Sequence, residues 1–243
     1  MIQYNPLQYL PTAEELPDSD DTPVDNELQI LIAHLLRVIL ALLWAERTDW
    51  FLGTNMGVYY EPGTDAIVPD GFLSLGVERF KAGGKLRLSY VLWQEKDIVP
   101  QWVLEVVSKT PGGEYEGKMT KYAEMGVLYY TIYNPDYWKR DKHDPLKVYR
   151  LVNGIYERQT GNPVWMPEIE LGIGCERGTH EGYTLEWLYW YNQQGNRFPA
   201  PANVIEQERQ RAEQERQRAD QLEQQLEDLR AKLRERGIDP DSL

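Results

Sequence analysis

The sequence predicts an α/β domain followed by a helical tail, and three patterns support this prediction. Residues 102–108 and 128–133 are short, almost wholly apolar runs, as expected of strands that are buried on both faces. The helix-like stretch 114–125 lies between them and ends at Gly126, so the three segments form the pattern of a parallel βαβ crossover. Residues 205–236 contain neither Gly nor Pro and carry a heptad repeat, which is typical of a long, paired helix.

Length and composition set the expected domain organisation. The chain has 243 residues, of which 42% are hydrophobic, and this is enough for one well-packed domain with an appendage. We expect an acidic, proline-rich arm at residues 1–26, a core domain at 27–198 and the C-terminal helix at 199–243. The longest apolar run, residues 28–44, is broken by a histidine and an arginine, so it predicts a buried helix rather than a membrane span.

Charge and cysteine content restrict the location and the partners of the protein. The net charge of −13 argues at first sight against nucleic acid as a partner. Residues 1–27 contribute −7 and residues 199–243 contribute −3, however, which leaves only −3 for residues 28–198. The acidity is therefore weak evidence against a DNA-binding face on the core. Cys175 is the only cysteine, and without a signal peptide ahead of it we expect a reducing cytoplasm.

The first half of the core is expected to begin with a helix. Leucine and isoleucine recur at helical spacing over residues 28–43, and Asp25 or Asn26 is suited to cap the first turn. Two short strands are expected at residues 50–52 and 58–60 on the evidence of their aromatic and β-branched residues.

A further strand is expected at residues 66–73, although Pro69 and Asp70 fall in its middle. Proline cannot donate a hydrogen bond to a neighbouring strand, so this strand lies at an edge or bends at that point. Residues 90–93 form another candidate strand.

The second half of the core contains a strong hairpin signal. Residues 147–151 and 155–158 flank an Asn-Gly pair, the sequence preferred by the tightest hairpin turns. Residues 184–191 are rich in aromatic side chains, and we expect them to form a short helix.

The tail is expected to pair through a narrow apolar seam. The clearest apolar seam positions are Leu222, Leu226, Leu229 and Leu233. Glutamates occupy seam positions nearer the start of the tail, so the pairing should be weaker there. The simplest arrangement is a homodimer through residues 205–236, and the alternative is that the helix folds back on its own core.

A constellation of charged residues could carry chemistry. Glu105 interrupts a buried strand, and a buried carboxylate without a partner is costly, so some group must satisfy it. Asp70 on a neighbouring strand could share a divalent cation with Glu105, and the carbonyl of Val106 is a candidate third ligand. Lys118 and Lys121 lie on the helix that follows the Glu105 strand, where a lysine could orient water or neutralise developing charge.

Each of these residues also has an interpretation without chemistry. Asp70 could hydrogen-bond its own backbone in a turn. Glu105 could form a structural ion pair with Lys118 and hold no metal. Lys121 fits an ordinary solvent-facing helix position.

The residues resemble those of a known family when they are taken as a set. Pro69-Asp70, Leu104–Ser108, Lys118–Tyr122 and Gly126–Tyr130 are similar to the motifs of the Uma-type restriction endonuclease family, within the PD-(D/E)XK nuclease superfamily. The resemblance extends over about residues 25–195 and implies a restriction-endonuclease-like mixed sheet flanked by helices.

The resemblance also implies roles for individual residues. It implies that Asp70 and Glu105 bind Mg²⁺, with Mn²⁺ as a substitute. In most of the superfamily the lysine stands two residues after the glutamate, where this chain has Val107. In the Uma-type pattern the lysine moves to the next helix, four residues before a tyrosine, and Lys118 fits this position whereas Lys121 does not.

Two further acidic residues are weaker correspondences. Glu114 stands four residues before Lys118, where the family often has an aspartate. Glu27, at the start of the first helix, could match an acidic residue that some superfamily members have there.

The expected function is therefore that of an Mg²⁺-dependent endonuclease that hydrolyses DNA phosphodiester bonds with metal-activated water. Asp70 and Glu105 would bind the ion, with the Val106 carbonyl beside them, and Lys118 would position or polarise the attacking water. The alternative is a catalytically inactive module that keeps the nuclease fold and acts in binding or assembly through its coiled coil, because fold does not imply function.

Overall fold

A computed structural model of the chain describes residues 9–17, 26–110 and 112–237, and it divides into two compact units, residues 1–198 and 199–243. Most of the acidic arm expected at residues 1–26 lies outside the described residues. In chain order the elements are α1 (Glu27–Leu43), β1 (Trp50–Thr54), β2 (Val58–Tyr59), β3 (Gly71–Leu75), the 3₁₀ turn Ala82–Gly84, β4 (Tyr90–Val91), the 3₁₀ turn Leu92–Gln94, β5 (Trp102–Val106), α2 (Gly117–Met125), β6 (Tyr129–Tyr133), α3 (Trp138–Asp141), β7 (Leu146–Val152), β8 (Ile155–Gln159), β9 (Val164–Met166), β10 (Leu171–His180), β11 (Tyr183–Tyr191) and α4 (Pro201–Glu235).

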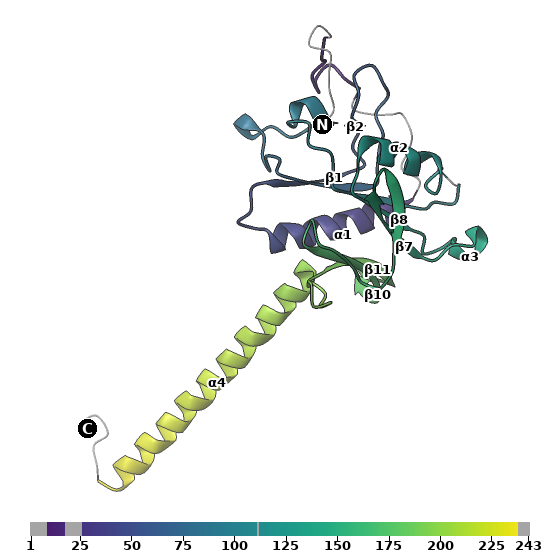
Figure 1. Ribbon diagram of the computed structural model, residues 1–243. Coiled ribbons are helices and arrows are strands. Elements are labelled where there is room, and N and C mark those ends of the chain that lie inside the picture. The colour runs from purple at the N-terminus through teal and green to yellow at the C-terminus, as the bar shows by residue number, and fades with distance from the viewer. Residues whose placement is uncertain (1–8, 18–25, 111, 238–243) are drawn as a thin grey trace. The chain divides into compact units, whose positions relative to one another are not determined.

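The centre of the first unit is a six-stranded mixed sheet with the order β1-β3-β5-β6-β7-β8 (Figure 1). β5 and β6 run parallel and are joined through α2, while the other neighbours in this sheet run antiparallel. The predicted βαβ crossover is therefore present, and the α/β fold class is confirmed. β9, β10 and β11 form a second, antiparallel sheet, and β2 and β4 form a short parallel pair.

The alternating side chains of β5 assign the two faces of the sheet. Val103 belongs to the same hydrophobic cluster as Tyr122 and Met125 of α2. Trp102 points to the opposite face, where its ring contacts the ring of Trp190 at 4.8 Å. The indole of Trp190 donates a hydrogen bond to the carbonyl of Leu36, so α1 covers that face. Because side chains alternate along a strand, Glu105 points to the α2 side together with Val103.

The expected N-terminal helix is present with a complete cap. Asn26 accepts a hydrogen bond from the backbone N–H of Gln29, and the Gln29 side chain accepts one from the backbone N–H of Asn26. This reciprocal capping box satisfies two of the donors that a helix leaves open at its start. The predicted hairpin is present too, because β7 and β8 pair around Asn153 and Gly154, which have φ angles of 50° and 81°.

Two of the expected elements are different in the structure. The strand expected at residues 66–73 begins only at Gly71, and before it Ile67 makes a single isolated bridge to Val58. Pro69 cannot donate to a neighbouring strand, so regular pairing starts after it. The helix expected at residues 184–191 was wrong, because this segment is part of β11 and pairs along its length with β10. A short run of buried aromatic residues fits either structure by periodicity alone, and the long partner strand decides the outcome.

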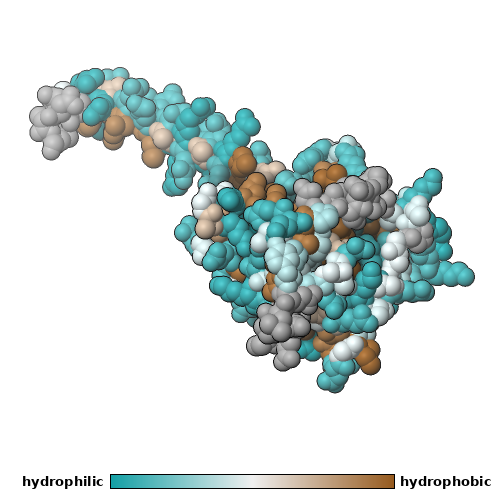
Figure 2. Space-filling view, turned by 90° about the horizontal axis from the view of Figure 1, so that it is seen from above, coloured by the Kyte–Doolittle hydropathy of each residue, from teal (hydrophilic) through white to brown (hydrophobic). Residues whose placement is uncertain are grey.

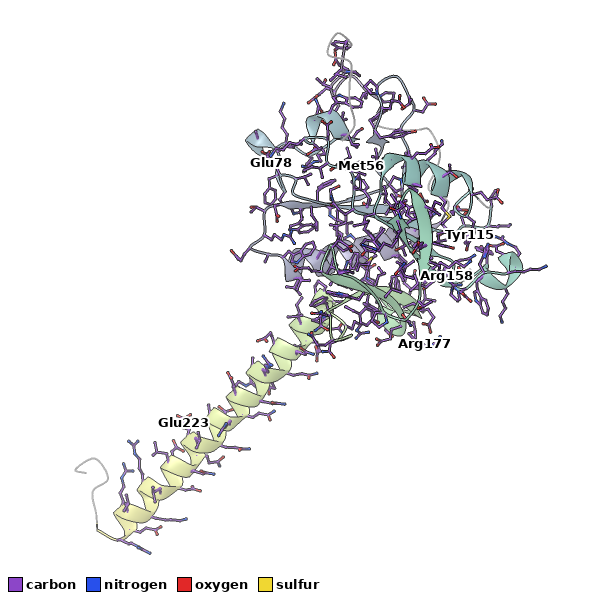
Figure 3. All side chains as sticks on the ribbon, in the orientation of Figure 1. Met56, Glu78, Tyr115, Arg158, Arg177 and Glu223 are labelled. Carbon is purple, nitrogen blue, oxygen red and sulfur yellow. The ribbon has the colours of Figure 1, made fainter. Side chains whose placement is uncertain are left out.

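The second unit contains the 35-residue helix α4, and no residue of this helix is buried. Its side chains project around the whole circumference, Glu223 among them (Figure 3). Among the described residues, no helix is apolar over the length that a membrane span requires.

Candidate functional site

Glu105 of β5 is 1% exposed, and both of its carboxylate oxygens have partners. The ammonium group of Lys118 lies 2.7 Å from Oε2. The phenolic hydroxyl of Tyr122 donates to Oε1 at 2.5 Å. A carboxylate with a charged donor on one oxygen and a hydroxyl on the other is satisfied in spite of its burial.

The helix α2 supplies both partners of Glu105 because of its residue spacing. Lys118 and Tyr122 are four positions apart, so they lie on one face of the helix. Lys121 is exposed to solvent. The structure thus brings Lys118 to the candidate site and leaves Lys121 at the surface.

Asp70 lies immediately before β3 and is 9% exposed. β3 and β5 are antiparallel with Gly71 opposite Leu104, so the next position in the same register places Asp70 opposite Glu105. Residues that are directly opposite on antiparallel strands point to the same face. The Oδ2 atom of Asp70 accepts a hydrogen bond of 2.6 Å from the backbone N–H of Val106, which fixes Asp70 beside the end of β5.

The site perturbs the titration of all four side chains. Burial and the nearby carboxylate of Glu105 raise the pKa of Asp70 from 3.8 to about 8. Burial also raises the pKa of Glu105, against the opposing effects of Lys118 and Tyr122. Burial alone would lower the pKa of Lys118, but the surrounding carboxylates outweigh it and hold that pKa above its usual value. Burial and Glu105 raise the pKa of Tyr122 well above 10.0. Two carboxylates and a lysine with perturbed pKa values in one small region are typical of a functional site.

Sequence reasoning missed one residue of this site, Gln29 of α1. Its side-chain amide donates to the carbonyl of Val106 at 3.2 Å, and it is 6% exposed. Val106 is therefore held from both sides, because Asp70 accepts from its N–H and Gln29 donates to its C=O. The sequence signal was present, since Gln29 completes the capping box of α1, but nothing in the sequence shows where its amide group points.

The two weaker acidic candidates have other partners. Glu27 is exposed, and its carboxylate accepts a bond of 3.4 Å from the hydroxyl of Tyr183, so it is not one of the residues gathered around Glu105. Glu114 is 5% exposed, and both of its oxygens accept from the backbone N–H of Gly112 at 3.0 Å. Glu114 thus closes the loop that leads into α2, and its charge is felt by Asp70, Glu105 and Lys118.

The donor set can be tested for its fit to a divalent cation. Within the described ranges no group of three or more His, Cys, Asp and Glu side chains is arranged to hold a metal. Asp70 and Glu105 supply two carboxylates, however, and hard cations such as Mg²⁺ are bound by one or two carboxylates with carbonyl oxygens and water. The carboxylate of Glu105 raises the pKa of Asp70, and a bound cation would favour the ionised forms of both side chains. The residues present therefore fit an Mg²⁺ ion.

The chain also matches a known protein family. A comparison with protein families matches residues 15–179 to the Uma2 family, described as "Putative restriction endonuclease". The match covers more than half of the chain, and the chain belongs to this family. Among the curated proteins no match was found.

A solved structure of a "putative nuclease belonging to DUF820" from Anabaena variabilis ATCC 29413 is similar to part of the chain. The two share 14% sequence identity, and the similarity covers 65% of this chain and 89% of the other, with a TM-score of 0.43.

Proposed function

We propose that this protein is an Mg²⁺-dependent endonuclease that hydrolyses phosphodiester bonds in DNA, with Mn²⁺ able to replace Mg²⁺. The proposal rests on the placement of Asp70, Glu105 and Lys118. The register of β3 and β5 sets Asp70 opposite Glu105, and Lys118 reaches Glu105 from α2. Membership in a family of nuclease type supports the reaction class. The requirement for a metal and the location in the cytoplasm stay predictions.

Each residue of the chain has a distinct part in the proposed reaction. Asp70 and Glu105 would bind the ion together with the carbonyl of Val106. A bound Mg²⁺ would lower the pKa of a water molecule and stabilise negative charge on the phosphate. Lys118 would orient the attacking water or neutralise charge on the phosphate oxygens, because its ammonium group already lies beside Glu105.

Tyr122 has a positioning part in this proposal. Its hydroxyl holds Oε1 of Glu105 and so fixes the orientation of the carboxylate plane. The pKa of Tyr122 is raised well above 10.0 by burial and by Glu105, so the hydroxyl keeps its proton and stays a donor at neutral pH. Attack by water, without a covalent intermediate on the protein, is the simplest mechanism that these residues allow.

One observation favours the alternative of an inactive nuclease fold. The Glu105–Lys118 contact would look the same in a purely structural ion pair, since both oxygens of Glu105 are satisfied by the protein alone. In that case the chain would act in binding or assembly through its C-terminal helix. The distinction depends on whether the site takes up a metal and cleaves DNA.

A cleavage assay on supercoiled and linear DNA tests the proposal. The full-length protein should cut both substrates with Mg²⁺ or Mn²⁺, and EDTA should stop the reaction. Asp70→Asn should abolish cutting, which excludes a contaminating nuclease. A protein that binds Mn²⁺ weakly or not at all and leaves both substrates intact would contradict the proposal and support the inactive alternative.

A further inference from the structure

The helix α4 carries an exposed apolar seam. The heptad places apolar residues at one set of seam positions, Ile205, Ala212, Ala219, Leu226 and Leu233, and mixed residues at the other, Glu208, Glu215, Leu222, Leu229 and Arg236. Leu222, Leu226 and Leu229 are 59%, 49% and 55% exposed. Figure 2 shows hydrophobic residues along one side of α4. A helix that is polar everywhere except for such a seam gains most of its stability by covering that seam.

We infer that α4 pairs with the α4 of a second copy of the chain, as a parallel, in-register two-stranded coiled coil. This inference does not rest on the proposed nuclease activity. In a parallel pair every residue of the seam faces its own counterpart, so the leucine positions 222, 226, 229 and 233 form four consecutive Leu–Leu layers. A single protein can thus supply both halves of the interface, as expected of a two-fold symmetric dimer.

Charge complementarity supports the parallel orientation. The sequence Glu-Gln-Glu-Arg-Gln-Arg-Ala occurs at 206–212 and again at 213–219, and it places Glu208 and Glu215 in the seam. In a parallel pair each of these glutamates faces its own counterpart and also lies against the next residue of the partner helix, which is an arginine in both repeats. The seam glutamates therefore meet arginines across the interface at two levels.

The positions that flank the seam carry one repulsive and one attractive pair. Arg211 precedes the seam residue Ala212 and faces Arg216, which follows the seam residue Glu215. The attractive pair lies one heptad later. Arg218 precedes the seam residue Ala219, and Glu223 follows the seam residue Leu222, so these two flanking positions face each other across a parallel pair. Within one helix, Arg211 pairs with Glu208 and Arg216 pairs with Glu213, all four side chains being exposed. Such i,i+3 pairs stabilise the helix itself, and pairing between helices adds contacts to them.

The antiparallel orientation is less favourable. If two copies of α4 overlapped along their full length in opposite directions, Glu215 would face Leu226 and Glu208 would face Leu233. Leu226 is flanked by Gln225 and Glu227, so the carboxylate of Glu215 would be buried against leucine without a cation, whereas Lys232 and Arg234 flank Leu233. A shorter antiparallel overlap would join Leu222 to Leu233 and Leu226 to Leu229, but it would leave the two heptads at 206–219 uncovered.

Disulfide trapping tests the orientation in the full-length chain. With Cys175 replaced by serine, Leu229→Cys should form a covalent dimer on mild oxidation, because a disulfide requires Cα atoms within about 7 Å. Gln224→Cys, on the opposite side of the helix, is the matched control and should stay mostly monomeric on a non-reducing gel. If Leu229→Cys does not cross-link although the protein is a dimer in solution, the parallel register is wrong.

Light scattering tests the partner. The full-length protein should have twice the mass of one chain, and Leu226→Glu with Leu229→Glu should halve it. The control, Gln221→Glu with Gln224→Glu, adds the same charge away from the seam and should stay dimeric. Near-UV circular dichroism of the core should be unchanged in all variants, which excludes global unfolding. A monomeric full-length protein at micromolar concentration, or a dimer that survives the double leucine substitution, would overturn the inference.

Discussion

Lys118 and Glu105 form an ion pair of 2.7 Å between the first turn of α2 and the centre of the sheet. The carboxylate is almost fully buried, whereas the side chain of the lysine is 30% exposed. Removing one partner of such a pair affects the two sides differently. Without Glu105, the side chain of Lys118 can turn to solvent. Without Lys118, the buried carboxylate of Glu105 keeps its charge only at a high cost in free energy, or it takes up a proton. Substitutions at the two positions therefore have different consequences.

Substitution of Glu105→Gln should abolish Mn²⁺ binding. The amide keeps the shape of the side chain and can still accept from Tyr122, so the fold should persist with a change of about 1 kcal/mol in the free energy of unfolding. Isothermal titration with Mn²⁺ measures the binding, and urea unfolding measures the stability. Mn²⁺ binding equal to that of the unsubstituted protein would show that Glu105 is not a ligand.

The two lysines of α2 should behave differently. Lys118→Ala should lose DNA cleavage by at least about 100-fold, as expected for a charged group that acts at the reacting phosphate. Lys121→Ala is the matched control, because Lys121 lies one helical turn away and is exposed, and it should keep its activity. Single-turnover rates on a plasmid substrate provide the comparison. Equal losses in both variants would mean that the cleavage does not depend on the contact with Glu105.

Asp70 should make the stability of the fold depend on pH. Its pKa is raised from 3.8 to about 8 because of burial and Glu105, so between these values the folded protein holds a proton that the unfolded chain releases. The contribution of Asp70 to stability is therefore full below pH 3.8 and is lost as the pH rises towards 8.

Asp70→Asn removes this titration and keeps a side-chain oxygen that can accept from Val106. The difference in the free energy of unfolding between Asp70→Asn and the unsubstituted protein should grow from pH 5 to pH 8 in the absence of metal. Urea unfolding at several pH values measures it. If the free energy of unfolding changes with pH in the same way in both proteins, the raised pKa of Asp70 is wrong.

Gln29 should affect the site through Val106. Gln29→Leu removes the hydrogen bond to the Val106 carbonyl, and we expect the affinity for Mn²⁺ to fall about 10-fold, the size of effect seen for groups that orient metal ligands. The substitution also breaks the capping box of α1, which costs about 1 kcal/mol of stability. Asn26→Ala breaks the same cap and leaves Gln29 in place, so it is the control.

If Asn26→Ala weakens Mn²⁺ binding as much as Gln29→Leu does, the effect comes from the end of α1 and not from the contact with Val106. Both variants should lose similar stability in urea, which makes metal affinity the deciding measurement.

The sequence predicted the parts of the fold that depend on local pattern. The apolar runs of β5 and β6, with a helix between them, define the crossover, and the Asn153-Gly154 pair defines the hairpin turn. The structure of residues 184–191 could not be predicted in this way. The aromatic residues of this segment are compatible with a helix. They form a strand because they pair with β10, and the sequence of β10 alone does not reveal which segment it pairs with.

The candidate site was predictable to a similar extent. Asp70, Glu105 and Lys118 were recognisable because they stand in a set of motifs, and the structure brings them together. Gln29 was not recognisable, because its contact with Val106 depends on how α1 lies across the sheet, and this is a tertiary relationship between residues 77 positions apart. Glu27, at the start of the same helix, was named as a candidate site residue because it is charged. It is exposed, and its carboxylate accepts a hydrogen bond from Tyr183.

The short length of α2 has a consequence for how the protein responds to heat. Isolated helices shorter than about 12 residues are only marginally stable in water. Since α2 has nine residues, its stability depends on the packing of the buried Tyr122 and Met125. Local opening of this one segment would take Lys118 and Tyr122 away from Glu105 while the six strands stay paired. Amide hydrogen exchange should therefore be faster in α2 than in β5. We expect warming to abolish DNA cleavage reversibly, at a temperature below the unfolding temperature of the sheet.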